Sequence, residues 1–195
     1  MKKIVVAEFV SLDGVMQAPG GAEEDLDGGF THGGWTRPYW HDDMGVTLFE
    51  EIGKADTLLL GRKTWQGHAA AFEPAPADDP FAGMLNGLKK YVVSTTLKSV
   101  DAWRNSTIIR ENVVDEVRKL KEQAGKDIYV DGSSVLVHAL TQAGLVDEYS
   151  LLVFPLVLGN GKRVFSEGFY SGLKLIETKS FPTGVVLMRY QPERK

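Results

Sequence analysis

Short apolar runs alternate with amphipathic stretches over most of the chain. The runs KIVVAEFV, DTLLLG, KYVVST, STIIR and DIYVDG have the length and apolar content of strands buried inside a sheet. Amphipathic stretches typical of helices cover residues 42–55, 112–125 and 133–144. Three further strand patterns, DEYSLLVFPLVLG, LKLIETKSF and GVVLMRYQP, follow one another at the C-terminal end. This order predicts an α/β fold with a mixed, mostly parallel central sheet that finishes in antiparallel strands.

Capping residues mark where the predicted helices begin. Asp42 or Asp43 is the expected N-cap of the first helix, and Asn112 and Ser133 are the expected N-caps of the other two. A glycine- and acid-rich loop, residues 11–35, separates the first strand from the first helix. A loop of that length inside a compact domain is usually functional or mobile, so we expect it to act as a lid.

Composition narrows the class of protein. The length of 195 residues favours one domain covering residues 1–195. The formal net charge is −4 with both signs interspersed, which argues against nucleic acid or a membrane surface as partner. The lack of cysteine excludes disulfides and thiolate chemistry. Glu8 interrupts the first apolar run and no apolar stretch reaches membrane-spanning length, so we expect a cytoplasmic protein with a small-molecule substrate.

Two predicted strands end on a glycine directly before a helix. Such a junction points backbone N–H groups and the positive end of the helix dipole beyond the sheet edge, where they attract an anion. The first junction, Gly61 to Thr64, adds the cations Arg62 and Lys63, of which arginine can hold a phosphate by two hydrogen bonds. The second, YVDGSSVL, adds serine hydroxyls after Gly132.

A third strand end adds more hydroxyl groups to the same predicted edge. Ser94, Thr95 and Lys98 follow the strand KYVVST. Three polar strand ends at one edge indicate a ligand that carries several phosphates. None of the three matches the Rossmann dinucleotide fingerprint or the P-loop.

These segments carry a family resemblance. The sequence GRKTW after a buried strand resembles the Gly-Arg-x-Thr-Trp motif of dihydrofolate reductases. The segment DIYVDGSSVLVHALTQAGLVDEYSLLVFPLVLGNGKRVF, with SLDG after the first strand, is similar to the reductase domain of the bifunctional riboflavin-biosynthesis deaminase/reductase. The chain is thus identified as a stand-alone member of the dihydrofolate-reductase-like family of riboflavin reductase C-terminal type. The resemblance implies a three-layer fold of that type.

The resemblance also implies NADPH as cofactor. Arg62 would face the 2′-phosphate beside Ser94 and Thr95, and Thr64 would bind the adenosine-side phosphates. The loop after the strand DIYVD would wrap the pyrophosphate, and the backbone of Ala7 would lie near the nicotinamide carboxamide. The full set of cofactor-binding residues expected from this resemblance is Ala7, Gly61, Arg62, Lys63, Thr64, Ser94, Thr95, Asp131, Gly132, Ser133, Ser134 and Val135.

The chain departs from the dihydrofolate reductase pattern at two places. Asp131-Gly132 replaces the usual Gly-Gly pair, which puts an acid beside the expected pyrophosphate and leaves open the cis peptide known at that pair. An ungapped count back from Gly61 puts Gly45 where that family has its catalytic carboxylate, with Asp42 and Asp43 about one turn away. The second departure argues against folate as the natural substrate.

The sequence therefore predicts an NADPH-dependent reductase that passes hydride to a small heterocyclic or carbonyl acceptor. It would resemble 5-amino-6-(5-phosphoribosylamino)uracil reductase or dihydrofolate reductase. Asp13, Asp42, Asp43 or a bound water is the candidate proton source. The alternative is a nucleotide-binding or sensing protein without turnover. We expect no metal site, and the strand-rich C-terminal region predicts a homodimer, because symmetric association commonly buries exposed strand edges.

Overall fold

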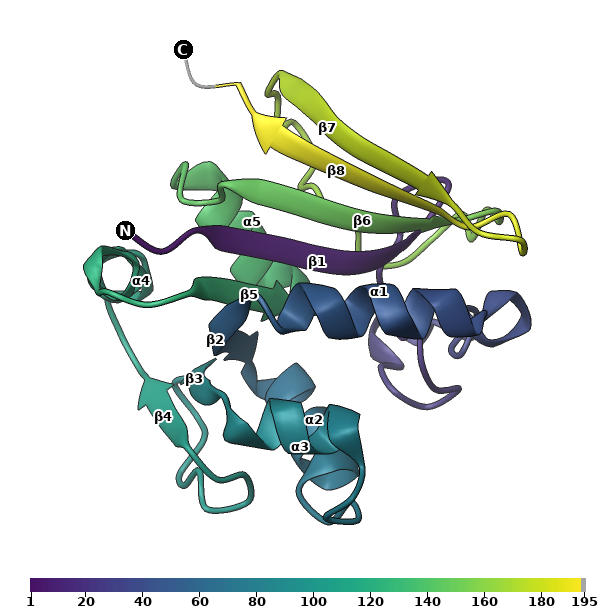
Figure 1. Cartoon of the computed structure of the whole chain (residues 1–195). Coiled ribbons are helices and arrows are strands. Elements are labelled where there is room, and N and C mark those ends of the chain that lie inside the picture. Colours follow the sequence, from purple (N-terminus) through teal and green to yellow (C-terminus); the bar gives the residue numbers. More distant parts are fainter. Residues whose placement is uncertain (194–195) are drawn as a thin grey trace.

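The computed structural model describes residues 1–193, which form one eight-stranded sheet flanked by helices (Figure 1). The strand order is β4-β3-β2-β5-β1-β6-β8-β7. The strands are β1 Ile4–Ser11, β2 Ala55–Gly61, β3 Lys89–Val93, β4 Ser106–Ile109, β5 Asp127–Asp131, β6 Glu148–Phe154, β7 Leu173–Ser180 and β8 Val186–Pro192. The α-helices are α1 Asp42–Ile52, α2 Arg62–Phe72, α3 Pro80–Gly87, α4 Val113–Glu122 and α5 Ser134–Gln142.

Strand direction divides the sheet as the pattern predicts. Neighbours from β4 to β6 are parallel, whereas β8 runs antiparallel to β6 and β7 antiparallel to β8. The mixed, mostly parallel sheet with antiparallel C-terminal strands is therefore confirmed. Because all the parallel strands point the same way, their carboxyl ends meet at one edge, where ligands of open α/β sheets bind.

Two apolar layers cover the central strands. On one face, residues of α4 and α5 such as Val117, Leu136 and Leu140 pack on Val6 and Val130. On the other face, α2, α3 and the end of α1 contribute Trp65, Leu85 and Ile52 against Leu58 and Tyr129, among others. The result is the three-layer arrangement expected of a dihydrofolate-reductase-like fold.

The helix N-termini differ from the predicted caps. His41, and not Asp42 or Asp43, is the N-cap of α1, and its imidazole accepts a hydrogen bond from the Asp43 amide at 3.3 Å. Asn112 and Ser133 do hold the N-cap positions of α4 and α5, but neither side chain caps its helix. Both residues have a left-handed backbone, with φ of 52° and 67°, instead of the extended backbone of an ordinary N-cap.

The long loop after β1 is fixed to the body of the protein. Trp35 is buried and donates from Nε1 to the carbonyl of Gln17 at 2.7 Å, and the Thr36 hydroxyl donates to the carbonyl of Pro19. Trp35 also packs on Phe154 of β6 in a third apolar cluster. The loop thus lies as an ordered strap beside the carboxyl edge of the sheet.

Candidate functional site

A cleft of about 1160 Å³ opens at the carboxyl edge of the parallel strands. Three adjacent strands contribute to its wall, through Gly61 at the end of β2, Asp131 at the end of β5 and Ala7 in the middle of β1. Ala7 and Asp131 are register partners in the parallel β1–β5 pair. The cleft therefore lies where the sequence places its two strand-glycine-helix junctions.

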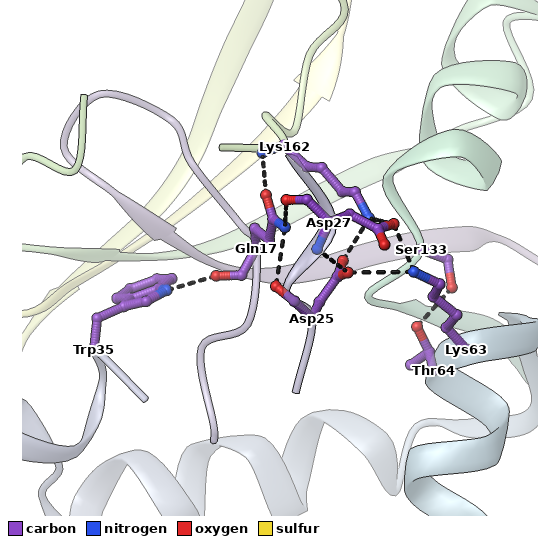
Figure 2. Close-up of polar contacts among 8 residues, drawn as sticks. All are labelled: Gln17, Asp25, Asp27, Trp35, Lys63, Thr64, Ser133 and Lys162. Carbon is purple, nitrogen blue, oxygen red and sulfur yellow. Dashed lines mark hydrogen bonds and ion pairs between the residues drawn. The ribbon is translucent and has the colours of Figure 1, made fainter. Parts of the chain in front are cut away.

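The two junctions are interlocked through one serine. The Ser133 hydroxyl accepts a hydrogen bond from the Gly61 amide at 2.8 Å and lies 2.8 Å from the Thr64 hydroxyl (Figure 2). The start of α2 is thereby bonded to the residue immediately before α5. Because Ser133 uses its side chain in this way, it leaves the amides of α5 without a side-chain cap.

Glycine is required at both junctions because the helices approach so closely. A Cβ on Gly61 would lie 2.7 Å from the Ser133 hydroxyl. A Cβ on Gly132 would lie 2.8 Å from the Thr64 hydroxyl, and Gly132 also has a φ of +59°. Contacts that short are forbidden for real side chains, and positive φ favours glycine. Among residues 1–193 no peptide bond is cis, so the Asp131–Gly132 bond is trans.

Helix N-termini in the cleft wall present free N–H groups. The first backbone hydrogen bond recorded for α5 runs from Val137 to the Ser133 carbonyl, which leaves the amides of the first turn for another acceptor. No side chain caps α2 or α5, whereas His41 caps α1 and Asp79 caps α3. Uncapped amides and the helix dipole together favour an anion at this place.

The two cations of GRKTW have different surroundings. Arg62 lines the cleft, and its guanidinium donates to Gln66 one turn along α2 at 3.1 Å. Lys63 forms ion pairs with Asp27 at 2.5 Å and with Asp25 at 3.3 Å, both in the loop after β1. Arg62 is thus the cation that remains available to a ligand, while the charge of Lys63 is shared with the loop.

Lys162, in the segment between β6 and β7, forms ion pairs with the same two aspartates as Lys63. Its ammonium lies 2.7 Å from Asp27 and also pairs with Asp25 (Figure 2). Hydrogen bonds from Lys162 and Lys63 lower the pKa of Asp27 to about 2. Gln17 supports this cluster, because its amide nitrogen donates to the carbonyls of Asp25 and Asp27 at 3.0 Å each. The predicted lid is therefore held across the cleft by lysines from two other segments.

Glu8 is a buried carboxyl in the cleft wall. It is 6% exposed, and one oxygen accepts from the Gly132 amide at 3.1 Å. Its other oxygen, Oε1, is buried without a hydrogen-bond partner among the described residues. Burial raises the pKa of Glu8 well above 4.5, the Asp131 charge adds to that rise, and the Gly132 hydrogen bond only partly offsets it.

His68 of α2 pairs with Asp131 inside the cleft. Its Nε2 lies 2.6 Å from the Asp131 carboxylate, and the two side chains are 26% and 41% exposed. Burial lowers the pKa of His68, but the charge and hydrogen bond of Asp131, with the charge of Glu24, outweigh burial and raise that pKa above 6.5. The negative charge of Asp131 is thus balanced by a histidine that the chain places beside it.

Helix α1 contributes a different carboxylate from the expected one. Its cleft-lining residues are Leu48, Glu51 and Ile52, and Gly45 is not among them. Glu51 is buried, and its carboxylate lies 3.4 Å from the Arg189 guanidinium. Burial raises the pKa of Glu51 in spite of the Arg189 charge. Within residues 1–193 no three histidine or acidic side chains are arranged to hold a metal ion.

The cleft brings together most of the residues that the sequence assigns to the cofactor. The predicted residues that line the cleft are Ala7, Gly61, Arg62, Lys63, Thr64, Asp131, Gly132, Ser133, Ser134 and Val135. Ser94 and Thr95 are not part of its wall, although the preceding Val93 is. The Ser94 hydroxyl accepts from the amides of Thr96 and Leu97 and so closes the turn after β3.

The three predicted proton sources lie outside the cleft wall. Asp42 and Asp43 are exposed in the first turn of α1. Asp13 accepts hydrogen bonds from the Leu158 and Gly159 amides at 3.1 and 2.9 Å, and from the Ser11 hydroxyl. The structure therefore gives Asp13 a bracing contact between two loops.

Sequence reasoning missed Glu8, Glu51 and His68 as cleft residues. For two of these residues the sequence contains a feature that could have identified them. Glu8 is the single charge in an otherwise apolar strand, and His68 lies one helical turn after Thr64, on the same face of the helix. No such feature marks Glu51, because the ungapped count back from Gly61 places the expected carboxylate at position 45.

Comparison with known proteins agrees with this geometry. The family model described as RibD C-terminal domain matches residues 2–187. The chain belongs to the RibD C-terminal domain family. Two Bacillus subtilis (strain 168) relatives match over most of both chains. The uncharacterized protein YyaP is 32% identical over 193 residues, 97% of this chain and 94% of the relative. The uncharacterized protein YwjB is 28% identical over 190 residues, 95% of this chain and 96% of the relative.

Three solved structures share the fold of this chain. A putative riboflavin biosynthesis protein from Shewanella sp. PV-4 aligns with a TM-score of 0.73 at 21% identity, covering 98% of this chain and 99% of its own. A pyrimidine reductase-like protein from Corynebacterium diphtheriae aligns with a TM-score of 0.67 at 15% identity, covering 100% of this chain and 93% of its own. Dihydrofolate reductase from Enterococcus faecalis, in complex with NADP(H) and RAB-propyl, aligns with a TM-score of 0.63 at 16% identity, covering 98% of this chain and 97% of its own.

No helix among the described residues combines the length and the apolar character that crossing a membrane requires.

Proposed function

We propose that this protein is an NADPH-dependent reductase that transfers hydride to a small heterocyclic or carbonyl acceptor. The observation that carries the proposal is the meeting of two uncapped helix N-termini with Arg62 in one cleft, at the carboxyl edge of a parallel sheet. Such an arrangement suits the phosphates of a dinucleotide. The solved dihydrofolate reductase of the same fold is a complex with NADP(H), which supports this choice of cofactor.

The donor set fits the parts of NADPH in order along the sheet edge. Arg62 would hold the 2′-phosphate, and Thr64 would contact the adenosine-side phosphates. The amides of Ser133 and Ser134 and the hydroxyl of Ser134 would surround the pyrophosphate, and the backbone of Ala7 would hold the nicotinamide carboxamide. When bound, NADPH would supply the hydride, and the protein would supply orientation and exclusion of water.

The other side chains that line the cleft indicate which kind of acceptor fits it. Phe9, Trp40 and Leu48 give an apolar wall, and Glu51, Asp131 and His68 give it polar groups. A flat heterocycle or a carbonyl compound with hydrogen-bonding groups suits such a wall. The reductase resemblance favours an acceptor like 5-amino-6-(5-phosphoribosylamino)uracil, and Glu51 is the carboxylate that α1 offers to an acceptor in the cleft.

A cytoplasmic homodimer remains part of the proposal. Leu175 and Ile176 on the edge strand β7 are 50% and 47% exposed, and α1 exposes Val46 and Phe49. Exposed apolar side chains along a strand edge favour association of two copies. Light scattering across micromolar concentrations should give twice the chain mass, and a monomer mass throughout would reject the homodimer.

The test of the proposed function begins with cofactor binding. Titration of the protein with NADPH, followed by cofactor fluorescence, should give saturable binding that is tighter than binding of NADH. The same protein is then screened for NADPH oxidation with pteridines, ribosylated aminopyrimidines, quinones and aldehydes. Saturable binding without oxidation by any acceptor would favour the alternative, a nucleotide-binding or sensing protein.

A further inference from the structure

The His68–Asp131 pair lines the cleft next to the strand proposed to hold the nicotinamide. Asp131 is the register partner of Ala7, whose backbone would hold the nicotinamide under the proposed function. His68 reaches the same point from α2, with Nε2 at 2.6 Å from the Asp131 carboxylate. Both side chains line the cleft. A carboxylate-bound imidazole thus lines the cleft, held by the strand that pairs with the proposed nicotinamide site.

The second ring nitrogen of His68 is the free one. Among residues 1–193 no protein group forms a hydrogen bond with Nδ1, whereas Nε2 is committed to Asp131. Aromatic rings pack around the imidazole, with Phe72 at 5.4 Å and Trp103 at 6.1 Å between ring centroids. The ring is therefore held in place by packing and by one strong hydrogen bond, and within residues 1–193 its Nδ1 has no hydrogen-bond partner.

The charged groups around the pair favour a protonated ring. Asp131 on β5 and Glu24 in the loop after β1 are the acids that raise the pKa of His68. Glu8 on β1 is a third acid close enough to Asp131 to interact with it. Burial raises the pKa of Glu8, and the Asp131 charge adds to that rise. No cation among the described residues contacts the imidazole. The acids beside His68 therefore favour the protonated form of its ring over the neutral form.

The pairing also accounts for the acid at position 131. A carboxylate beside a pyrophosphate site would repel the cofactor if it stood alone. With the proton on His68, the pair has no net charge, so Asp131 can occupy this position without opposing the phosphates. The same carboxylate then holds the ring in a single orientation, as a carboxylate behind a catalytic histidine does in other enzymes.

We infer that His68 is the proton donor to the acceptor and that Asp131 is its positioning residue, an inference that rests on the proposed reductase function. Hydride addition to the carbon of a C=O or C=N bond moves the π electron pair onto the oxygen or nitrogen. That atom takes the proton from Nδ1 of the imidazolium, so one N–H bond breaks and one O–H or N–H bond forms. His68 is left neutral, still bonded to Asp131, and water restores its proton.

The first arm of the test needs no cofactor. Nuclear magnetic resonance of nitrogen-15-labelled histidine follows His68 through a pH titration, with His68→Gln used to assign its signals. We expect the pKa of His68 to lie above the 6.5 of a free histidine side chain, and to fall in Asp131→Asn, which removes the charge that raises it. A His68 ring that is neutral at pH 7, or one that Asp131→Asn leaves unaffected, would overturn the inference.

The second arm measures turnover with the best acceptor from the screen. The rate of the unmodified protein should fall as pH rises through the pKa of His68 measured by resonance. His68→Gln should lower kcat about 100-fold to 10,000-fold and lose that pH dependence, with the Kd for NADPH nearly unchanged. His32→Gln is the control and should leave both unchanged. Full activity or an unaltered pH profile in His68→Gln would overturn the inference.

The two arms separate this inference from the proposed function. If the unmodified protein fails to bind NADPH, or binds it and reduces no acceptor, the proposed function fails and the proton-donor role fails with it. If the protein binds NADPH and reduces an acceptor while His68→Gln behaves like the unmodified protein, only the inference fails. An unchanged Kd for NADPH in His68→Gln serves as the check that the variant is folded.

Discussion

Thr64 Oγ1 lies 2.8 Å from Ser133 Oγ, and this contact joins the starts of α2 and α5 in the wall of the cleft. The same serine accepts from the Gly61 amide, so one side chain connects the two strand-glycine-helix junctions. The anion-binding geometry of the cleft thus depends on residues that are 69 and 72 positions apart in the sequence. A change at Ser133 should therefore affect both the fold and the cofactor.

Ser133→Ala should reduce the free energy of unfolding by about 1–3 kcal/mol, because it leaves the Gly61 amide without its partner. Ser133→Gly should reduce the free energy of unfolding by less than Ser133→Ala does. Ser133 has a φ of +67°, and glycine adopts that backbone without strain. Both variants should weaken NADPH binding. Chemical denaturation and fluorescence titration measure the two effects. Equal stability of Ser133→Ala and the unmodified protein would mean that the hydroxyl does not hold the junctions together.

Arg62→Ala should weaken NADPH binding by about 1.5–3 kcal/mol, the worth of a charge-assisted contact, and should weaken NADH binding much less. The reason is that only NADPH carries the 2′-phosphate proposed to face Arg62. The matched control is Arg118→Ala, which removes an exposed arginine paired with Asp115 on α4. Equal losses for NADPH and NADH would remove Arg62 from the 2′-phosphate site.

Asp13→Asn should destabilise the protein by about 1–3 kcal/mol, because Asp13 accepts hydrogen bonds from the Leu158 and Gly159 amides. Burial alone would raise the pKa of Asp13, but these bonds and the one from Ser11 lower it from 3.8 to about 2. The carboxylate therefore stabilises the fold above about pH 4, and this contribution is lost as pH falls towards 2.

Denaturation of Asp13→Asn between pH 2 and pH 7 checks this prediction. The difference from the unmodified protein should be largest at neutral pH and should shrink in acid. NADPH oxidation by the folded variant should be nearly unchanged. A folded Asp13→Asn that has lost turnover would instead restore Asp13 as the proton source expected from the sequence.

Glu8→Gln should raise stability at neutral pH relative to the unmodified protein. The pKa of Glu8 in the folded state lies well above 4.5 because of burial first and the Asp131 charge second. The folded protein therefore binds a proton that the unfolded chain releases, so stability falls as pH rises above about 4.5 towards the folded-state pKa. Glutamine keeps the carbonyl oxygen that accepts from Gly132 and does not titrate.

Thermal unfolding of Glu8→Gln and the unmodified protein from pH 4 to pH 9 tests this linkage. The two stability curves should lie close together near pH 4 and diverge as pH rises. Parallel curves over the whole range would show that Glu8 titrates normally in the folded protein, and that its buried oxygen has a partner in solution.

The parts of the site that could be predicted from sequence are those encoded locally. A buried strand, a glycine and a helix start follow one another at Gly61 and again at Gly132, so the pattern alone indicates two anion-binding junctions. The parallel sheet follows from the alternation of strands and helices. These features depend on neighbours within one or two turns, and for this reason the single sequence was enough.

The parts that could not be predicted depend on distant contacts. His68 and Asp131 are 63 residues apart, and nothing near either residue indicates the other. Asp13 looks the same in the sequence whether its carboxylate faces the cleft or braces Leu158, which is 145 residues away. The N-cap of α1 was misplaced because the imidazole of His41 can accept a hydrogen bond as an aspartate does.

Transfer of labelled hydride is the most direct test of the central claim that this cleft makes the protein an NADPH-dependent reductase. The protein is incubated with the acceptor panel and with NADPH that carries deuterium on one face or the other of nicotinamide C4, and mass spectrometry follows the acceptors. We predict that one acceptor gains a single deuterium from one labelled form and none from the other, because the cleft fixes the face of the ring. Saturable NADPH binding with no label transferred from either form to any acceptor would contradict the claim.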